Sequence, residues 1–252
     1  MLDLIKLRLR HGNQAIADIR KAAIMDTHRG FPVMDEKGAT AGWQHACDVC
    51  PTGALTSTPM AIDLGKCIFC GECQHASNGA IRFSKDYKLA ASKRERLIVS
   101  AGTGYEEYKT SAIEAEKRIH KLFGRSLKLR QVSAGGCNGC EMELSACGNV
   151  NFDMGRFGID FVASPRHADG LVITGPITRN MAPALMDAYK SISEPKIVVA
   201  VGACAISGGL FADSEKLNRE FMDTIKIDLF IPGCPPHPLT IINAILDFLG
   251  NK

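Results

Sequence analysis

Two stretches of the sequence share one pattern, KIVVAVGAC (196–204) and DLFIPGC (228–234). Each runs through apolar, partly β-branched residues and reaches a glycine, after which a cysteine follows either directly (Cys234) or after one alanine (Cys204). LVITG (171–175) is a third run that ends in glycine. Short apolar runs of this kind, separated by helical patterns, predict parallel strands with helices on both faces. The helical patterns cover Ala182–Ile192, Ser214–Ile225 and Leu239–Leu249. The predicted fold class of this half of the chain is therefore α/β with a parallel sheet.

A fourth run, SLKLRQVSAGG (126–136), leads into Cys137-Asn-Gly-Cys140. Ligands of open α/β sheets gather outside the carboxyl ends of the strands. We therefore expect Cys137, Cys140, Cys204 and Cys234 to converge, although they come from three separate loops. Soft thiolates suit both zinc and iron–sulfur clusters. One C-x2-C pair with two isolated cysteines, the last followed by Pro235, favours a cluster over a structural zinc site, which usually takes two C-x2-C pairs.

The composition excludes several classes of protein. The chain has 252 residues, 46% of them hydrophobic and 23% charged, as expected of a soluble globular protein with one or two domains. Its formal net charge of +3 is too small to argue for a nucleic-acid partner. It has no apolar run of about 18 residues, so no transmembrane helix is predicted, and no export signal is visible. Ten cysteines in a chain that is neither small nor visibly exported favour metal binding over disulfides.

Five cysteines lie in the amino-terminal half, in the patterns Cys47-x2-Cys50 and Cys67-x2-Cys70-x2-Cys73. The two C-x2-C pairs alone also match a zinc ribbon. However, Cys73 extends the second pair, and Cys50 is followed by proline in CPTGAL (50–55). Bacterial ferredoxins combine a C-x2-C-x2-C run with a remote Cys-Pro ligand. The spacing thus predicts a cluster held by Cys50, Cys67, Cys70 and Cys73, with Cys47 either spare or competing with Cys50.

Four segments are predicted along the chain. Residues 1–30 form a basic arm, helical in part, with apolar side chains at Leu4, Leu7, Leu9 and Ile16. Residues 31–92 form a small domain with short strands near ALTST (54–58) and AIRFS (80–84). Residues 93–126 form a helical connector, and residues 127–252 form the α/β domain. In the connector, one helical face is expected to carry Tyr105, Tyr108, Ala112, Ala115, Ile119 and Leu122, with a Glu114–Arg118 pair and Gly124 as the C-cap.

Four motifs in order carry a family resemblance: GGCNGCEMEL (135–144), SPRHADGLVITGP (164–176), VAVGACAISGG (199–209) and IPGCPPHP (231–238). They resemble the small subunit of membrane-bound, energy-converting group 4 [NiFe] hydrogenases, including formate hydrogenlyase, and are similar to the 20-kDa subunit of respiratory complex I. The resemblance implies a flavodoxin-like domain whose proximal [4Fe–4S] cluster is held by Cys137, Cys140, Cys204 and Cys234. The C-N-G-C spacing resembles the hydrogenase branch, since the complex I version usually has adjacent cysteines.

The amino-terminal segment looks like a fused, one-cluster ferredoxin-like domain, as IDLGKCIFCGEC (62–73) indicates. Four further residues are candidates. Glu143 matches an acidic position of the family and is expected either to move protons near the cluster or to serve a structural role. Arg166 and His167 are expected near the cluster, where they would stabilise its reduced state. Cys147 is expected to be a small buried thiol.

The resemblance implies an oxidoreductase subunit that carries electrons through two [4Fe–4S] clusters to or from a [NiFe] site on a partner large subunit. It also implies membrane-embedded partners, an electron donor of the ferredoxin or dehydrogenase kind, and a peripheral place on the cytoplasmic side of the membrane. One alternative is the equivalent subunit of a complex I-like quinone oxidoreductase or of a nickel-less relative. Another is a zinc-stabilised scaffold or assembly factor without redox function.

Overall fold

The computed structural model describes residues 2–35, 40–114, 117–124 and 126–250. The amino-terminal part contains α1 Leu2–His11, β1 Pro32–Met34, α2 Thr40–Asp48, β2 Leu55–Ser57, β3 Met60–Asp63, α3 Glu72–Ala76, β4 Ile81–Phe83, η1 Arg94–Leu97, β5 Ile98–Ser100, α4 Tyr105–Ala112 and α5 Lys117–Phe123. The carboxy-terminal part contains β6 Leu127–Ser133, α6 Gly139–Ala146, η2 Met154–Phe157, β7 Ile159–Phe161, η3 Pro165–His167, β8 Gly170–Thr174, α7 Ala182–Ser191, β9 Ile197–Val201, α8 Ala203–Ser207, η4 Gly209–Phe211, α9 Glu220–Thr224, β10 Leu229–Ile231 and α10 Pro238–Phe248.

The carboxy-terminal part is built on a five-stranded sheet with the order β10-β9-β8-β6-β7. Every neighbouring pair in this sheet is parallel. When the five strands are counted along the chain, the order is 2-1-3-4-5, which is the flavodoxin-like order. The predicted α/β class is therefore confirmed, and the three predicted strands correspond to β8, β9 and β10. The three-residue strand β7 was not predicted, because a stretch this short has no clear periodicity.

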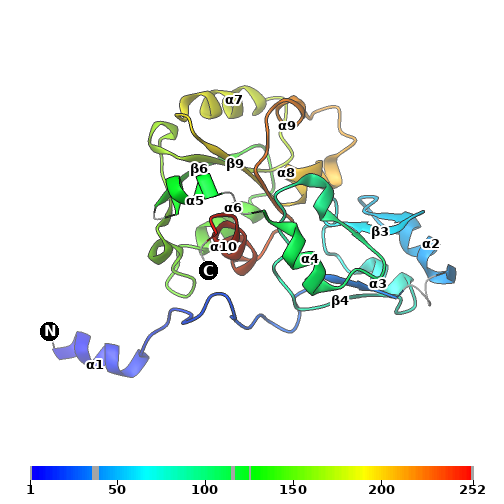
Figure 1. Cartoon of the computed structure of the whole chain (residues 1–252), viewed down its shortest axis with the longest axis horizontal. Helices are drawn as coiled ribbons and strands as arrows, with labels where there is room; N and C mark the ends of the chain where they lie inside the picture. Colours follow the sequence, from blue (N-terminus) through cyan, green and yellow to red (C-terminus); the bar gives the residue numbers. More distant parts are fainter. Residues whose placement is uncertain (1, 36–39, 115–116, 125, 251–252) are drawn as a thin grey trace.

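Both faces of the sheet are covered, as the apolar strands require. Alternate residues of β8 and β9 belong to two separate hydrophobic clusters: Leu171, Ile173 and Val198 to one, Val172 and Val199 to the other. The first cluster includes side chains of α7 and α9, whereas the second includes those of α6 and α10. Figure 1 shows α7 and α10 on opposite sides of the strands. The period of two along each strand thus sends successive side chains into different layers.

The amino-terminal part contains two small antiparallel sheets, β1-β4 and β2-β3-β5. From β1 to β4 the element order is β-α-β-β-α-β, and α2 packs against α3. Helix α1 extends away from the rest of the chain (Figure 1), and its side chains Leu4 and Leu9 are exposed. The arm that follows returns to the body, where the Asn243 side chain in α10 donates to the carbonyl of Ile19.

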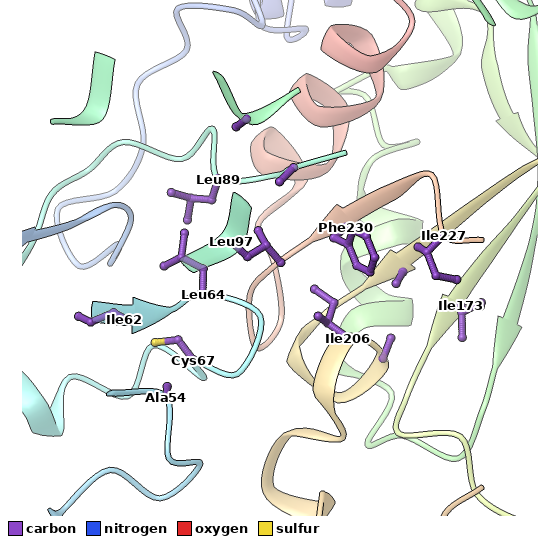
Figure 2. Close-up of a cluster of buried hydrophobic side chains, with 14 of the residues drawn as sticks. Ala54, Ile62, Leu64, Cys67, Leu89, Leu97, Ile173, Ile206, Ile227 and Phe230 are labelled. Atoms are coloured by element: carbon purple, nitrogen blue, oxygen red, sulfur yellow. The ribbon is translucent and has the colours of Figure 1, made fainter. Parts of the chain in front are cut away.

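The small sheets and the parallel sheet share one hydrophobic cluster. Figure 2 shows Leu64, Cys67 and Leu97 of the amino-terminal part facing Ile206 and Phe230 of the α/β part. The backbones also meet, because Ala91 and Phe230 exchange two hydrogen bonds of 3.0 and 2.8 Å at the edge of β10. The two halves are therefore packed directly together.

The predicted connector helix differs from the observed one. Helix α4 ends at Ala112, whose carbonyl accepts from the backbone N–H of Ser92, and Glu114 pairs with Lys93 at 3.0 Å. Helix α5 begins only at Lys117 and ends directly before Gly124. Ala115 and the side chain of Arg118, which were part of the expected face and pair, lie outside the described residues. Tertiary hydrogen bonds to Ser92 end the first helix despite its periodic pattern.

The predicted helix over Ser214–Ile225 is also shorter than expected, since only Glu220–Thr224 is helical. The preceding residues pair with the loop after β8: Leu217 forms a bridge with Thr178, and Asn218 donates to the carbonyl of Ile177 at 2.9 Å. These backbone bonds draw the segment across the sheet edge instead of into a helix.

The stability of the amino-terminal part is expected to depend on Phe31. Its ring is 1% exposed and packs against Tyr105 and Tyr108, with centroid distances of 5.4 and 5.2 Å. Phe31→Ala should lower the free energy of unfolding by about 3–5 kcal/mol, because it leaves a cavity in a packed core. Anaerobic urea unfolding measures this. Val33→Ala, at a side chain that is 46% exposed, is the control and should change it by less than about 0.5 kcal/mol. Equal losses for the two variants would contradict the expectation.

Candidate functional site

Four cysteines line one cavity at the carboxyl edge of the parallel sheet. The cavity has an empty volume of about 320 Å³ and is lined by Cys137, Cys140, Cys204 and Cys234. Cys137 and Cys140 come from the loop after β6 and the start of α6, Cys204 from α8 directly after β9, and Cys234 from the loop after β10. The structure thus brings together the four residues that the strand pattern predicted to converge.

Two glycines make room for this cavity. Gly202 has a φ of +90°, and a Cβ atom there would lie 2.6 Å from the Sγ of Cys140. Gly175, at φ +79°, would place a Cβ atom 2.6 Å from the backbone nitrogen of Gly136. Both positions combine a left-handed backbone with a close neighbour, so only glycine fits without displacing the loops. The glycines at these strand ends therefore shape the cavity as well as turn the chain.

The four thiols are electrostatically unfavourable as thiolates when nothing balances them. Burial, together with the charges of neighbouring thiols, raises the pKa of Cys140 to about 12 and that of Cys204 to about 11. Burial and the charge of Cys137 also raise the pKa of Cys234. A cationic metal centre removes this conflict, because metal binding deprotonates thiols. The donor set therefore fits a thiolate-ligated iron–sulfur cluster.

The acidic residue that lines this cavity is Glu141, which the sequence analysis did not select. Its Oε1 accepts a hydrogen bond of 2.6 Å from the Thr174 hydroxyl. Burial raises the pKa of Glu141, but hydrogen bonds from Ser133 and Thr174 outweigh burial and hold it below its usual value. Its negative charge raises the pKa of Cys140. Glu143 is the acidic position that the family resemblance predicted, whereas Glu141 is the residue whose side chain lines the cavity and bonds to Thr174.

Glu143 lies on α6 outside the cavity lining, and burial raises the pKa of its carboxyl. Its carbonyl accepts from the Sγ of Cys147 at 3.2 Å. Cys147 is fully buried in the cluster that contains α10, and burial raises the pKa of its thiol. Arg166 and His167 are exposed in η3, which packs against β6 and α7 ahead of β8. They do not line the cavity, which forms where the strands end.

A second cavity contains the other predicted quartet. It has an empty volume of about 290 Å³ and is lined by Cys50, Cys67, Cys70 and Cys73. Burial, together with the charges of neighbouring thiols, raises the pKa of Cys67 to about 12 and that of Cys73 to about 11. The backbone N–H groups of Ala54 and Phe69 lie 3.3 Å from the sulfurs of Cys50 and Cys67. Such N–H···S bonds are the kind that tune cluster potentials.

Cys47 does not line this second cavity. It lies in α2, with its Sγ 3.5 Å from the hydroxyl oxygen of Ser57. In the described part of the chain, no three His, Cys, Asp or Glu side chains come close enough to share a single metal ion. The two quartets instead surround cavities of similar size, about 320 and 290 Å³. Four thiols are the donor set that an iron–sulfur cluster takes.

A third cavity, of about 730 Å³ empty volume, lies between the two quartets. It is lined by Ile68 and Phe69 from one cysteine loop and by Cys234 from the other. His28 and His237 also line it, with ring centroids 5.9 Å apart. His237 Nδ1 accepts from the Leu239 N–H at the start of α10, and burial lowers the pKa of His237 to about 4. Another cavity, of about 1150 Å³ empty volume, lies beside Arg20 and Lys88, and its lining among the described residues includes no cysteine.

The fold and this edge of the sheet define a class of protein: a flavodoxin-like domain that presents four thiols for a metal cluster where its strands end. Residues 137–248 match the family described as "NADH ubiquinone oxidoreductase, 20 Kd subunit". The chain belongs to this family, which includes hydrogenase small-subunit-like proteins. It is thus an oxidoreductase subunit of the type found in hydrogenase and complex I-like complexes. No helix of the described residues is long and apolar enough to cross a membrane.

Three relatives illustrate the match. The chain is 41% identical over 134 residues to a probable membrane-bound hydrogenase subunit mbhJ of Pyrococcus furiosus, covering 52% of this chain and 80% of that protein. It is 42% identical over 130 residues to formate hydrogenlyase subunit 7 of Escherichia coli, covering 52% of this chain and 51% of that protein. It is 43% identical over 107 residues to an NADH-quinone oxidoreductase subunit of Citrifermentans bemidjiense, covering 42% of this chain and 62% of that protein. The matches leave the amino-terminal cysteines without a counterpart in the family model.

The stability of the chain is expected to fall as the pH drops from about 6.5 to about 4, in part because of His237. Its folded-state pKa of about 4 lies below the ordinary value of 6.5, so in this range the unfolded chain binds a proton that the folded chain does not. His237→Asn keeps an acceptor for the Leu239 N–H and should flatten this part of the profile. Anaerobic unfolding at a series of pH values measures the slope. The exposed His167→Asn is the control, and an unchanged slope in His237→Asn would contradict the assignment.

Proposed function

We propose that this chain is an electron-transfer subunit that passes electrons through two [4Fe–4S] clusters to or from a [NiFe] site on a partner large subunit. The observation that carries the proposal is the division of eight cysteines into two quartets, each lining its own small cavity. The carboxy-terminal quartet lies within the matched family segment, and the amino-terminal quartet lies before it. The β-α-β-β-α-β order around the second quartet also supports a ferredoxin-like domain.

The residues of the chain have separate tasks in this proposal. The eight thiolates bind the clusters, which when bound take up and release single electrons. Backbone N–H groups at Ala54 and Phe69 donate to the sulfur ligands and stabilise their negative charge. Gly202 and Gly175 leave room for the cluster in the α/β domain.

The two cysteine loops approach each other at one place. A Cβ atom on Gly65, two residues before Cys67, would lie 2.8 Å from the side chain of Ile206, two residues after Cys204. The apolar side chains around this contact form one continuous cluster, as Figure 2 shows for Cys67, Leu64 and Ile206. We take this packed contact as the route by which an electron moves between the two domains.

The partners are inferred from the relatives. The relatives include a probable membrane-bound hydrogenase subunit and a formate hydrogenlyase subunit. The proposal therefore includes a hydrogenase-type large subunit next to the carboxy-terminal quartet, membrane-embedded subunits, and an electron donor that meets the amino-terminal domain. In this arrangement the chain is peripheral, on the cytoplasmic side of the membrane.

A second candidate function is the equivalent step in a complex I-like quinone oxidoreductase or a nickel-less relative. The 43% identity to an NADH-quinone oxidoreductase subunit supports it. The C-N-G-C spacing favours the hydrogenase branch, since the complex I branch usually has adjacent cysteines there. The clusters would serve both functions equally, so the partner decides between them.

Cluster content tests the ligand assignment. The anaerobically purified chain should contain about eight iron atoms, and Cys67→Ser or Cys137→Ser should reduce this to about four, because each variant loses one cluster. Iron and zinc analysis with EPR of the reduced protein measures this. Cys47→Ser and Cys147→Ser are the matched controls and should retain both signals. A colourless zinc protein would eliminate the redox proposal, and two intact clusters in Cys50→Ser would refute the assignment of Cys50 as a ligand.

The composition of the native complex tests the partner. Purification in mild detergent through this chain should recover a large subunit with nickel in stoichiometric amount, together with hydrogen-dependent reduction of a dye. A complex that retains the iron–sulfur signals but contains no nickel would favour the quinone oxidoreductase or nickel-less alternative. The same preparation of Cys137→Ser serves as the control, since it should lose the electron path while the subunits still associate.

A further inference from the structure

Arg219 lies directly before α9 and contacts the segment that contains Cys204. It is not part of the four sequence motifs. Its guanidinium donates four hydrogen bonds, all to backbone carbonyls. One nitrogen donates to the carbonyls of Pro176 and Cys204, both at 3.2 Å. The other donates to those of Ala205 and Ile206, at 2.8 and 2.9 Å.

These carbonyls belong to two loops that form the cavity. Pro176 directly follows Gly175, a lining residue, and Cys204 is a predicted ligand in the short helix α8. Carbonyls in the last turn of a helix lack partners within the helix, and an arginine side chain can satisfy them. Arg219 thus ties the loop after β8 to the helix that carries Cys204. The residues next to it reinforce this connection, since Asn218 donates to the carbonyl of Ile177.

Arg219 also brings a net positive charge to the site. Among the residues described, no carboxylate lies within ion-pair distance of its guanidinium, and the nearest acidic influence is the exposed Asp223. Burial lowers the pKa of Arg219, but a guanidinium remains charged in proteins. The charge of the neighbouring Arg94, by contrast, is balanced by Asp63, with which it forms two hydrogen bonds of 2.8 and 2.6 Å.

We propose that Arg219 is a positioning residue that holds the Cys204 loop in place and makes the carboxy-terminal cluster easier to reduce. Reduction adds one negative charge to a cluster, and a fixed, partly buried cation nearby stabilises that charge more than an exposed cation does. The direction of electron flow between the two cavities then depends on a residue outside both quartets. This inference rests on the proposed function, because it requires a cluster in each cavity.

Redox titration followed by EPR, on the full chain with both clusters, tests this role. Arg219→Gln removes the charge, so the midpoint potential of one of the two [4Fe–4S] signals should move to a more negative value while the other stays in place. Arg219→Lys keeps the charge and should restore most of the shift. The matched control is Arg179→Gln, which removes an exposed arginine from the neighbouring loop and should move neither signal.

A second variant, which is expected to shift the midpoint potential in the opposite direction, tests the proposal if Arg219→Gln does not fold. Asp223→Asn removes the acidic group that partly offsets Arg219, so the same signal should move to a more positive value. Selective loss of the carboxy-terminal cluster in Arg219→Gln, with its retention in Arg219→Lys, would also support the positioning role. Wild-type potentials for both signals in Arg219→Gln, or no movement in Asp223→Asn, would overturn it. Absence of cluster signals from the wild-type chain would instead overturn the proposed function.

Discussion

Four thiols gather at one edge of a parallel sheet, and much of the structure follows from keeping them there. Burial and mutual repulsion raise the pKa of Cys140 and of Cys204, so the group is poorly tolerated as thiolates unless a cation balances it. The surrounding backbone is shaped for such an occupant. Gly202 has no side chain where one would strike Cys140, and Gly175 lets its loop approach Gly136. Arg219 then ties two of the loops together through their carbonyls.

The amino-terminal domain also holds four thiols close together, but it is smaller than the α/β domain. Its quartet lies among short strands and helices, and two of its thiols have pKa values raised by burial. A domain this small buries little apolar surface of its own. It compensates by packing on the α/β domain, through the contact of Gly65 with Ile206 and the bridge between Ala91 and Phe230. The contact that stabilises the small domain is therefore also the place where the two cysteine loops approach each other.

Much of this arrangement could be predicted from residues alone, because strand ends and cysteine spacing are local features. The runs at 171–175, 196–202 and 228–233 became β8, β9 and β10, and both quartets that the spacing grouped line separate cavities. The predictions that differ concern positions where a distant segment competes with a local pattern. Helix α9 is short because Leu217 and Asn218 bond to the loop after β8. Arg166 and His167 belong to a family motif but do not line the cavity, because η3 precedes β8 and the cavity forms where the strands end.

The sequence by itself determined the α/β class, the family and the grouping of the cysteines. Short, continuously apolar runs require a sheet that is buried on both faces. A cysteine that directly follows such a strand must lie at the carboxyl edge of the sheet. Only the tertiary structure decided that Glu141 rather than Glu143 lines the cavity, that Cys47 and Cys147 lie outside both quartets, and that Arg219 bonds to the Cys204 loop. These outcomes depend on the direction in which a side chain points and on segments far apart in the chain. No spacing along the sequence contains that information.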